Sequence, residues 1–225
     1  FYGMFGRGLI FSAYEDRVVR VDTALDGIIF STRRGRLQGT AFSGTPSALD
    51  IDVRGADAEF DLGYNWQLGW TGLTYLAPAP AGKTNREWVT GVRMQKYMDI
   101  ADFYLEYAWK QGYDYETALD EEYQPGRAFY GSLNLYHGPV ALALEAKDYD
   151  RFAVLKKADG TVSLNNPPAL TREHLYTLLS RNTHNLNADD EIGGQAELTW
   201  TGPAGWSVVA SSNRTENHAR RVIFE

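Results

Sequence analysis

Cysteine is absent from the 225 residues of this sequence. Without cysteine the chain can form neither a disulfide nor a thiolate metal site, and it has no cysteine nucleophile. Long apolar runs are also missing, because no stretch approaches the roughly 20 residues that a transmembrane helix needs. These two absences exclude a disulfide-stabilised domain and a helical membrane protein.

Positive charge is scarce as well, since the formal net charge is −7. Nucleic-acid binding depends on a basic surface that neutralises phosphates, so we expect no nucleic-acid partner. The sequence contains no Gly-x-Ser-x-Gly elbow, no His-Glu-x-x-His motif and no phosphate-binding loop. We therefore expect no catalytic residue, cofactor or metal, and a protein that is not an enzyme. A barrel hydrolase with its site at the long-loop rim stays open as an alternative.

Aromatic residues and glycine are abundant, at 13% of the chain and 22 residues respectively. This composition suits strands and turns better than helices. The segment 58–70 alternates strictly between apolar and polar residues, which predicts a strand with one apolar and one polar face. The same period of two recurs in the segments 86–95, 102–110, 128–136, 140–147, 192–200 and 206–213, and the segment 27–42 predicts a hairpin around Arg34 and Gly35.

Short and long connections alternate between these strands. The expected short turns are 33–35, 65–67, 96–101, 137–139 and 201–205, and the long loops are 44–56, 77–86, 111–127 and 148–190. A barrel with tight turns at one rim and long loops at the other has this pattern, whereas a Greek-key sandwich does not. Strands of about nine to eleven residues also match a tilted membrane crossing.

The predicted fold is therefore an all-β, antiparallel up-and-down transmembrane β-barrel with about 10–12 readable strands. We expect residues 1–225 to be a single barrel domain or a fragment of a longer one. Aromatic residues near the strand ends predict two girdles at the lipid headgroups. The girdle residues would be Trp66, Trp70, Tyr136, Trp200 and Trp206 at the short turns, and Tyr75, Trp88, Trp109 and Phe129 at the long loops.

If the apolar face of each strand meets lipid, the opposite face points into the lumen. Charges of both signs there can pair across strands and fill the barrel, or line a polar pore. The sequence leaves both possibilities open, and neither sign dominates enough to predict a strongly ion-selective channel. The lumen-lining candidates are Glu59, Asp61, Glu87, Arg93, Glu106, Glu145, Lys147 and Glu197.

The long loop 148–190 contains leucines near helical spacing at 170–181. They predict a short amphipathic helix that either enters the lumen as a plug or lid, or packs on neighbouring loops. The consecutive Asp189, Asp190 and Glu191 lack the spacing of a calcium loop, so a solvated acidic strand start is favoured. The acidic run 114–122 is also favoured as a solvated surface. Candidates for loop binding are Arg181, His184, Asp190 and Glu191.

Two segments carry a family resemblance. The segment 6–28 contains an Asp-x-Ala-Leu-x-Gly turn, and the segment 167–200 contains Leu-Leu-x-Arg followed by Asp-Glu-x-Gly-x-Gln. Together they resemble the large, uncharacterised, porin-like outer-membrane β-barrel proteins of Gram-negative bacteria. The resemblance implies a bacterial outer-membrane location and a barrel longer than this chain, without an enzymatic activity.

The expected role is passive: a pore, a ligand-binding barrel or a surface scaffold. Its partners would be outer-membrane lipid and lipopolysaccharide, with small polar solutes or a surface protein as further candidates. The alternative is a secreted, soluble all-β carbohydrate-binding module whose Trp and Tyr side chains stack on sugars. The alternative requires the apolar strand faces to be buried between two sheets, at Phe60, Leu62, Leu133, Leu142 and Leu198.

Overall fold

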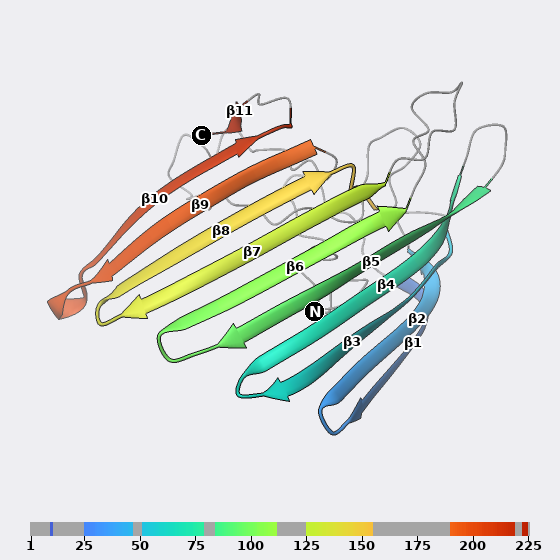
Figure 1. Ribbon diagram of the computed structural model, residues 1–225, viewed down its shortest axis with the longest axis horizontal. Coiled ribbons are helices and arrows are strands. Elements are labelled where there is room, and N and C mark those ends of the chain that lie inside the picture. Colours follow the sequence, from blue (N-terminus) through green and yellow to red (C-terminus); the bar gives the residue numbers. More distant parts are fainter. Residues whose placement is uncertain are drawn as a thin grey trace.

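The computed structural model describes residues 10, 25–46, 51–78, 84–111, 125–154, 190–218 and 222–224. These residues form one antiparallel sheet in which each strand pairs with its neighbours in the sequence (Figure 1). The sheet confirms the predicted all-β, up-and-down architecture, with ten long strands and the three-residue β11. The strands are β1 (Leu25–Arg34), β2 (Leu37–Pro46), β3 (Val53–Gly63), β4 (Trp66–Pro78), β5 (Thr84–Tyr97), β6 (Ala101–Gln111), β7 (Gly126–His137), β8 (Val140–Asp150), β9 (Asp190–Thr201), β10 (Ser207–Glu216) and β11 (Val222–Phe224).

Short connections lie at one end of the sheet and long ones at the other, as predicted (Figure 1). The β3–β4 connection consists of Tyr64 and Asn65, whose φ angles are 52° and 62°. Positive φ at both central residues is typical of a type I′ turn, which matches the twist of the flanking strands. The turn therefore lies one to two residues earlier than the predicted 65–67, because Trp66 and Gln67 already pair with β3.

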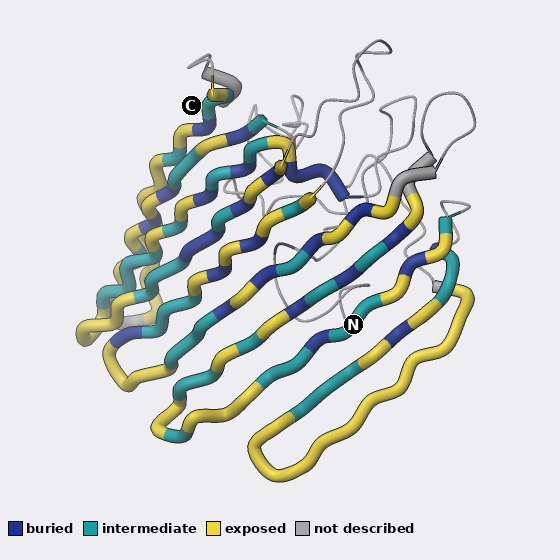
Figure 2. The backbone as a smooth tube through the Cα atoms, turned by 45° about the vertical axis from the view of Figure 1, so that its right-hand side comes forward, coloured by how far each residue is buried: buried dark blue, intermediate teal, exposed yellow. Residues whose placement is uncertain are grey.

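The sheet is a curved wall that remains open within the described residues, since β1 and β11 are not paired with each other (Figure 2). At the two edges of the sheet, in β1 and β10, side chains on both faces are exposed. In β1, three consecutive apolar side chains, Ile28, Ile29 and Phe30, are all exposed. Among all the residues that the structure describes, no helix is long and apolar enough to cross a membrane.

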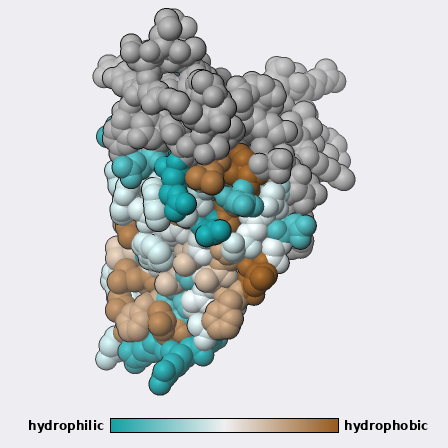
Figure 3. Space-filling view, turned by 90° about the vertical axis from the view of Figure 1, so that its right-hand side faces the viewer, coloured by the Kyte–Doolittle hydropathy of each residue, from teal (hydrophilic) through white to brown (hydrophobic). Residues whose placement is uncertain are grey.

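The two faces of the wall differ in polarity. The outer face carries exposed apolar side chains such as Phe60, Leu62 and Leu198, and no second sheet covers it in the described part. The inner face carries polar and charged side chains, yet many of these are buried. Figure 3, viewed from the side of β1 and β2, shows hydrophobic side chains gathered above a hydrophilic tip.

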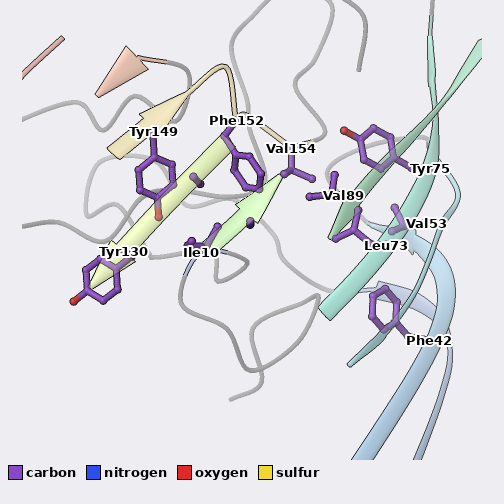
Figure 4. Packing of buried hydrophobic residues seen from close by; sticks show 12 residues of the cluster. Ile10, Phe42, Val53, Leu73, Tyr75, Val89, Tyr130, Tyr149, Phe152 and Val154 are labelled. Atoms are coloured by element: carbon purple, nitrogen blue, oxygen red, sulfur yellow. The ribbon is translucent and has the colours of Figure 1, made fainter. Parts of the chain in front are cut away.

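Towards the long loops, the inner face also carries many buried apolar side chains. A cluster of buried side chains covers this end of the sheet (Figure 4). Tyr75 belongs to it with only 3% of its surface exposed, so it is not part of an outer girdle. Tyr75 follows Thr71 and Leu73 at alternate positions of β4, so its side chain lies on the inner face with theirs. The cluster comprises Ile10, Phe42, Val53, Leu73, Tyr75, Val89, Ala108, Ala128, Tyr130, Tyr149, Phe152 and Val154.

Candidate functional site

The most extensive polar cluster on the inner face surrounds Arg93 of β5. Its guanidinium donates to both carboxylate oxygens of Asp57 on β3, at 2.7 and 3.1 Å, and to Thr71 Oγ1 on β4 at 3.0 Å. Thr71 in turn donates to Asp57 at 2.6 Å, and Glu59 lies 3.4 Å from the guanidinium. Gly69 faces Arg93 across the ladder, and a side chain there would overlap the guanidinium. Three strands thus hold one buried cation, with hydrogen bonds from both terminal nitrogens of its guanidinium.

Glu87 and Glu106 both accept hydrogen bonds from tyrosines on the same face. Tyr75 donates to Glu87 in a short hydrogen bond between β4 and β5. On β6, Glu106 Oε2 accepts from the hydroxyl of Tyr104 at 2.6 Å and from the backbone N–H of Ile10 at 3.0 Å. Ile10 is far away in sequence, so Glu106 joins the N-terminal part of the chain to the sheet.

A second buried ion pair joins Lys147 of β8 to Glu191 of β9, with side chains only 1% and 0% exposed. Glu191 faces Tyr149 across the ladder. The predicted solvated acidic strand start is therefore wrong at Glu191, because its parity directs it to the inner face. Nearby, Tyr130 donates to Glu145 at 3.3 Å.

The structure gathers most of the predicted lumen residues on one face. Glu87, Arg93, Glu106, Lys147 and Glu197 are buried there, and Glu59 and Glu145 are half-buried. Asp61 is instead exposed at the short-turn end, where it accepts a hydrogen bond from the backbone N–H of Gly63 at 2.7 Å.

The predicted lumen residues did not include Asp57, Thr71 or Tyr104, although Asp57 and Tyr104 share parity with the candidates Glu59 and Glu106 two residues away. Arg181, His184 and the predicted helix at 170–181 lie outside the described residues.

Asp190 takes part in a separate cluster at the long-loop end of the wall. His218, just beyond β10, lies 2.6 Å through Nδ1 from Asp190 and 2.9 Å through Nε2 from Asp148 of β8. Its backbone N–H also donates to Asp190 at 2.7 Å. Partial burial alone would lower the pKa of His218, but the hydrogen bonds to Asp190 and Asp148 and their charges outweigh it, so the pKa is raised.

The inner face thus presents fixed charges held in pairs and hydrogen-bonded networks. Among the described residues, no group of three or more His, Asp or Glu side chains is arranged to hold a metal ion. Such a face can orient and pass polar solutes, or it can rigidify a filled barrel. Paired charges of this kind do not by themselves provide a nucleophile or a general base.

Comparison with curated proteins finds no match. Comparison with protein families finds one whose model matches residues 1–211, described as "Family of unknown function (DUF6029)". The match spans nearly the whole chain and includes the Arg93 cluster and the Lys147–Glu191 pair. On this evidence the chain belongs to DUF6029, a family of unknown function.

Proposed function

We propose that this chain forms the wall of a bacterial outer-membrane β-barrel and acts there without catalysis, as a passive pore for small polar solutes. One observation carries the proposal: the strands expose their apolar side chains and bury their charged ones. On β5, Val92 is 47% exposed while its neighbour Arg93 is 6% exposed. A sheet in water has the opposite arrangement, with the apolar face covered.

The outer face supports a lipid environment. Monomeric soluble proteins rarely expose apolar patches of more than a few hundred Å². Here exposed apolar side chains continue across neighbouring strands, with Trp70, Val92 and Tyr107 side by side in register. The exposed Trp88 and Trp109 near the long loops suit the headgroup region, where lipid and lipopolysaccharide would be the partners.

The backbone hydrogen bonding of the strands also supports a membrane-spanning barrel. In hydrocarbon every backbone N–H and C=O group needs a partner, so only helices and closed barrels span a bilayer. From β2 to β9, each strand is paired on both sides over most of its length. Closure of the wall is part of the proposal, because the exposed edges of β1 and β10 would have to be paired within a membrane.

The inner face favours a pore over the other passive roles. Ligand-binding barrels present mainly apolar pockets with few polar groups. This face instead carries charges of both signs, at Arg93 and Asp57 in its middle and at Lys147 and Glu191 towards the long loops. A charged lining of this kind favours small polar solutes, although a surface scaffold would use the same wall.

Bilayer insertion of the full chain tests the proposal. Single-tryptophan variants that keep Trp70, Trp109 or Trp206 are reconstituted in vesicles whose acyl chains carry bromine. We expect strong quenching of Trp70 within the outer face and intermediate quenching of Trp109 near the headgroups. Trp206, in the short turn before β10, is the matched control and should be quenched less.

Equal and weak quenching at all three positions would contradict membrane insertion. A chain that stays monomeric in buffer without detergent would also contradict it. If such a chain bound polysaccharide, the carbohydrate-binding alternative would replace the proposal.

A further inference from the structure

The chain turns back over the inner face as it leaves β8. Arg151 has a φ of 52°, a conformation that reverses the chain direction. The next three residues, Phe152, Ala153 and Val154, are no more than 5% exposed. Lys110 Nζ on β6 donates to the carbonyl oxygen of Ala153 at 2.7 Å and so fixes this strap two strands away from its origin.

The strap packs closely against the sheet. A side chain at Gly126, the first residue of β7, would overlap the carbonyl oxygen of Arg151. The ring of Phe152 meets that of Tyr149 edge to face, with centroids 6.3 Å apart. These contacts are typical of a built interior rather than of a loop lying on a surface.

Ile10 lies at the same place on the inner face. Ile10 is fully buried, and its N–H donates to Glu106. Figure 4 shows Ile10 between the tyrosines of β7 and β8 and the valines and leucine of β3 to β5, beside Phe152 and Val154. Ile10 and the strap therefore pack in the same cluster on the inner face, although they are far apart in sequence.

A buried charged pair lies next to the strap on the same face, because Glu191 faces Tyr149 across the ladder and the Tyr149 ring meets that of Phe152. Lys147 and Glu191 lie on the polar face, where water in an open lumen would leave their side chains accessible. Their side chains are instead 1% and 0% exposed. The inner face is therefore covered around this pair.

We propose that Ile10 and Phe152–Val154, named here the inner plug, close the lumen at its long-loop end and that solutes pass when the plug is displaced. This inference rests on the proposed pore function and adds its regulation. The anchors are Glu106 for Ile10 and Lys110 for Ala153. The plug differs from the one predicted at 170–181, because it uses the residues that directly follow β8.

Thiol labelling tests whether the plug is held by its anchors. The chain has no native cysteine, so Ile10→Cys introduces a single thiol. We expect slow reaction with a maleimide in the folded protein. Adding Lys110→Met should speed labelling by about tenfold, as expected for the loss of a hydrogen bond to a charged group.

Lys96→Met is the matched control, because Lys96 lies over the Trp66 ring at the short-turn end. It should leave the labelling rate unchanged. Fast labelling of Ile10→Cys without any second change, or equal acceleration by Lys96→Met, would overturn the inner plug.

Conductance in a planar bilayer tests the closure itself. The full chain should conduct little, and both Lys110→Met and Ile10→Asp should raise its conductance several-fold, with Lys96→Met unchanged. Heat-modifiable gel mobility checks that each variant is folded. Folded, inserted variants with unchanged conductance would overturn the plug and leave the barrel intact. Failure of every form to insert would instead overturn the proposed function.

Discussion

The outer and inner faces of the wall are built from the same strands but are held by different interactions. Along the outer face, Trp70, Val92 and Tyr107 lie in register and form an apolar surface without ion pairs among them. Along the inner face, Arg93 and Asp57 depend on each other through two hydrogen bonds. The stability of the outer face requires only that its side chains stay uncharged. The stability of the inner face requires that each buried charge keeps its partner.

This difference has an energetic basis. A buried charge whose partner is removed keeps its desolvation cost, which makes paired networks sensitive to single substitutions. An apolar side chain facing lipid tolerates other apolar side chains but not a charge. Substitutions on adjacent residues of β5 can therefore separate the two faces.

The largest effect is expected from Arg93→Met. The change leaves Asp57 and Glu59 without their cation, and breaking a buried pair in this way costs about 3–5 kcal/mol. The free energy of unfolding, measured by urea titration of the reconstituted protein, should fall by this amount. The double variant Arg93→Met with Asp57→Leu removes both charges of the closest pair and should lose much less. If the single and double variants are equally unstable, the pairing does not determine the stability of this face.

Next comes Val92→Arg, which places a charge on the outer face one residue from the native arginine. An arginine facing lipid at the midplane costs about 2–4 kcal/mol, falling towards the interfaces. The inserted fraction in vesicles and the free energy of unfolding should both decrease. Gln95→Arg on the inner face of the same strand is the control and should have a clearly smaller effect. Equal losses at both positions would mean that the two faces meet the same solvent.

The faces of the strands could be predicted from the sequence, whereas contacts between distant residues could not. The period of two in 58–70 correctly predicted adjacent strands and their polar and apolar faces, because parity is a local property of a strand. It could not assign the inner plug, since Ile10 and Glu106 meet across 96 positions. Nor could it assign Glu191, whose partner Lys147 is determined by the β8–β9 register across a long loop.

Turn positions were predicted less accurately than faces. The segment around Tyr64 and Asn65 continues the apolar and polar alternation without a break, so only the backbone angles distinguish turn from strand. Tyr75 was assigned to the wrong face for a related reason. It was selected for its aromatic ring near a strand end, and its parity with the polar residues of β4 was not considered.

A smaller effect is expected from Gly69→Ala on the inner face. The added methyl group would overlap the Arg93 guanidinium, and overpacking of this kind costs about 1–3 kcal/mol. The free energy of unfolding should fall, and combination with Arg93→Met should remove most of the additional loss. Gly39→Ala is the control, because the same methyl group there meets only ordinary contacts at 3.9 Å. A similar loss at Gly39 would trace the effect to strand geometry rather than to Arg93.

The smallest effect belongs to the long-loop end, where His218 links β8 and β9. Its pKa is raised when it contacts Asp190 and Asp148. The stabilisation is therefore fully present below the ordinary histidine pKa of about 6.5 and is lost as pH rises through the raised value. Because His218 and both aspartates are about one-third or more exposed, the effect should be only about 0.2–1 kcal/mol.

Unfolding free energies at acidic and alkaline pH, compared between the wild type and His218→Gln, measure this contribution. Glutamine keeps a polar side chain but carries no titrating charge, so its pH dependence should be flatter by the same small amount. The inner-face ion pairs are common to both proteins and cancel in the comparison. An identical pH dependence would show that the two aspartates hold His218 through hydrogen bonds that do not need its charge. The long-loop end would then resemble the outer face, where changes in charge state contribute nothing to stability.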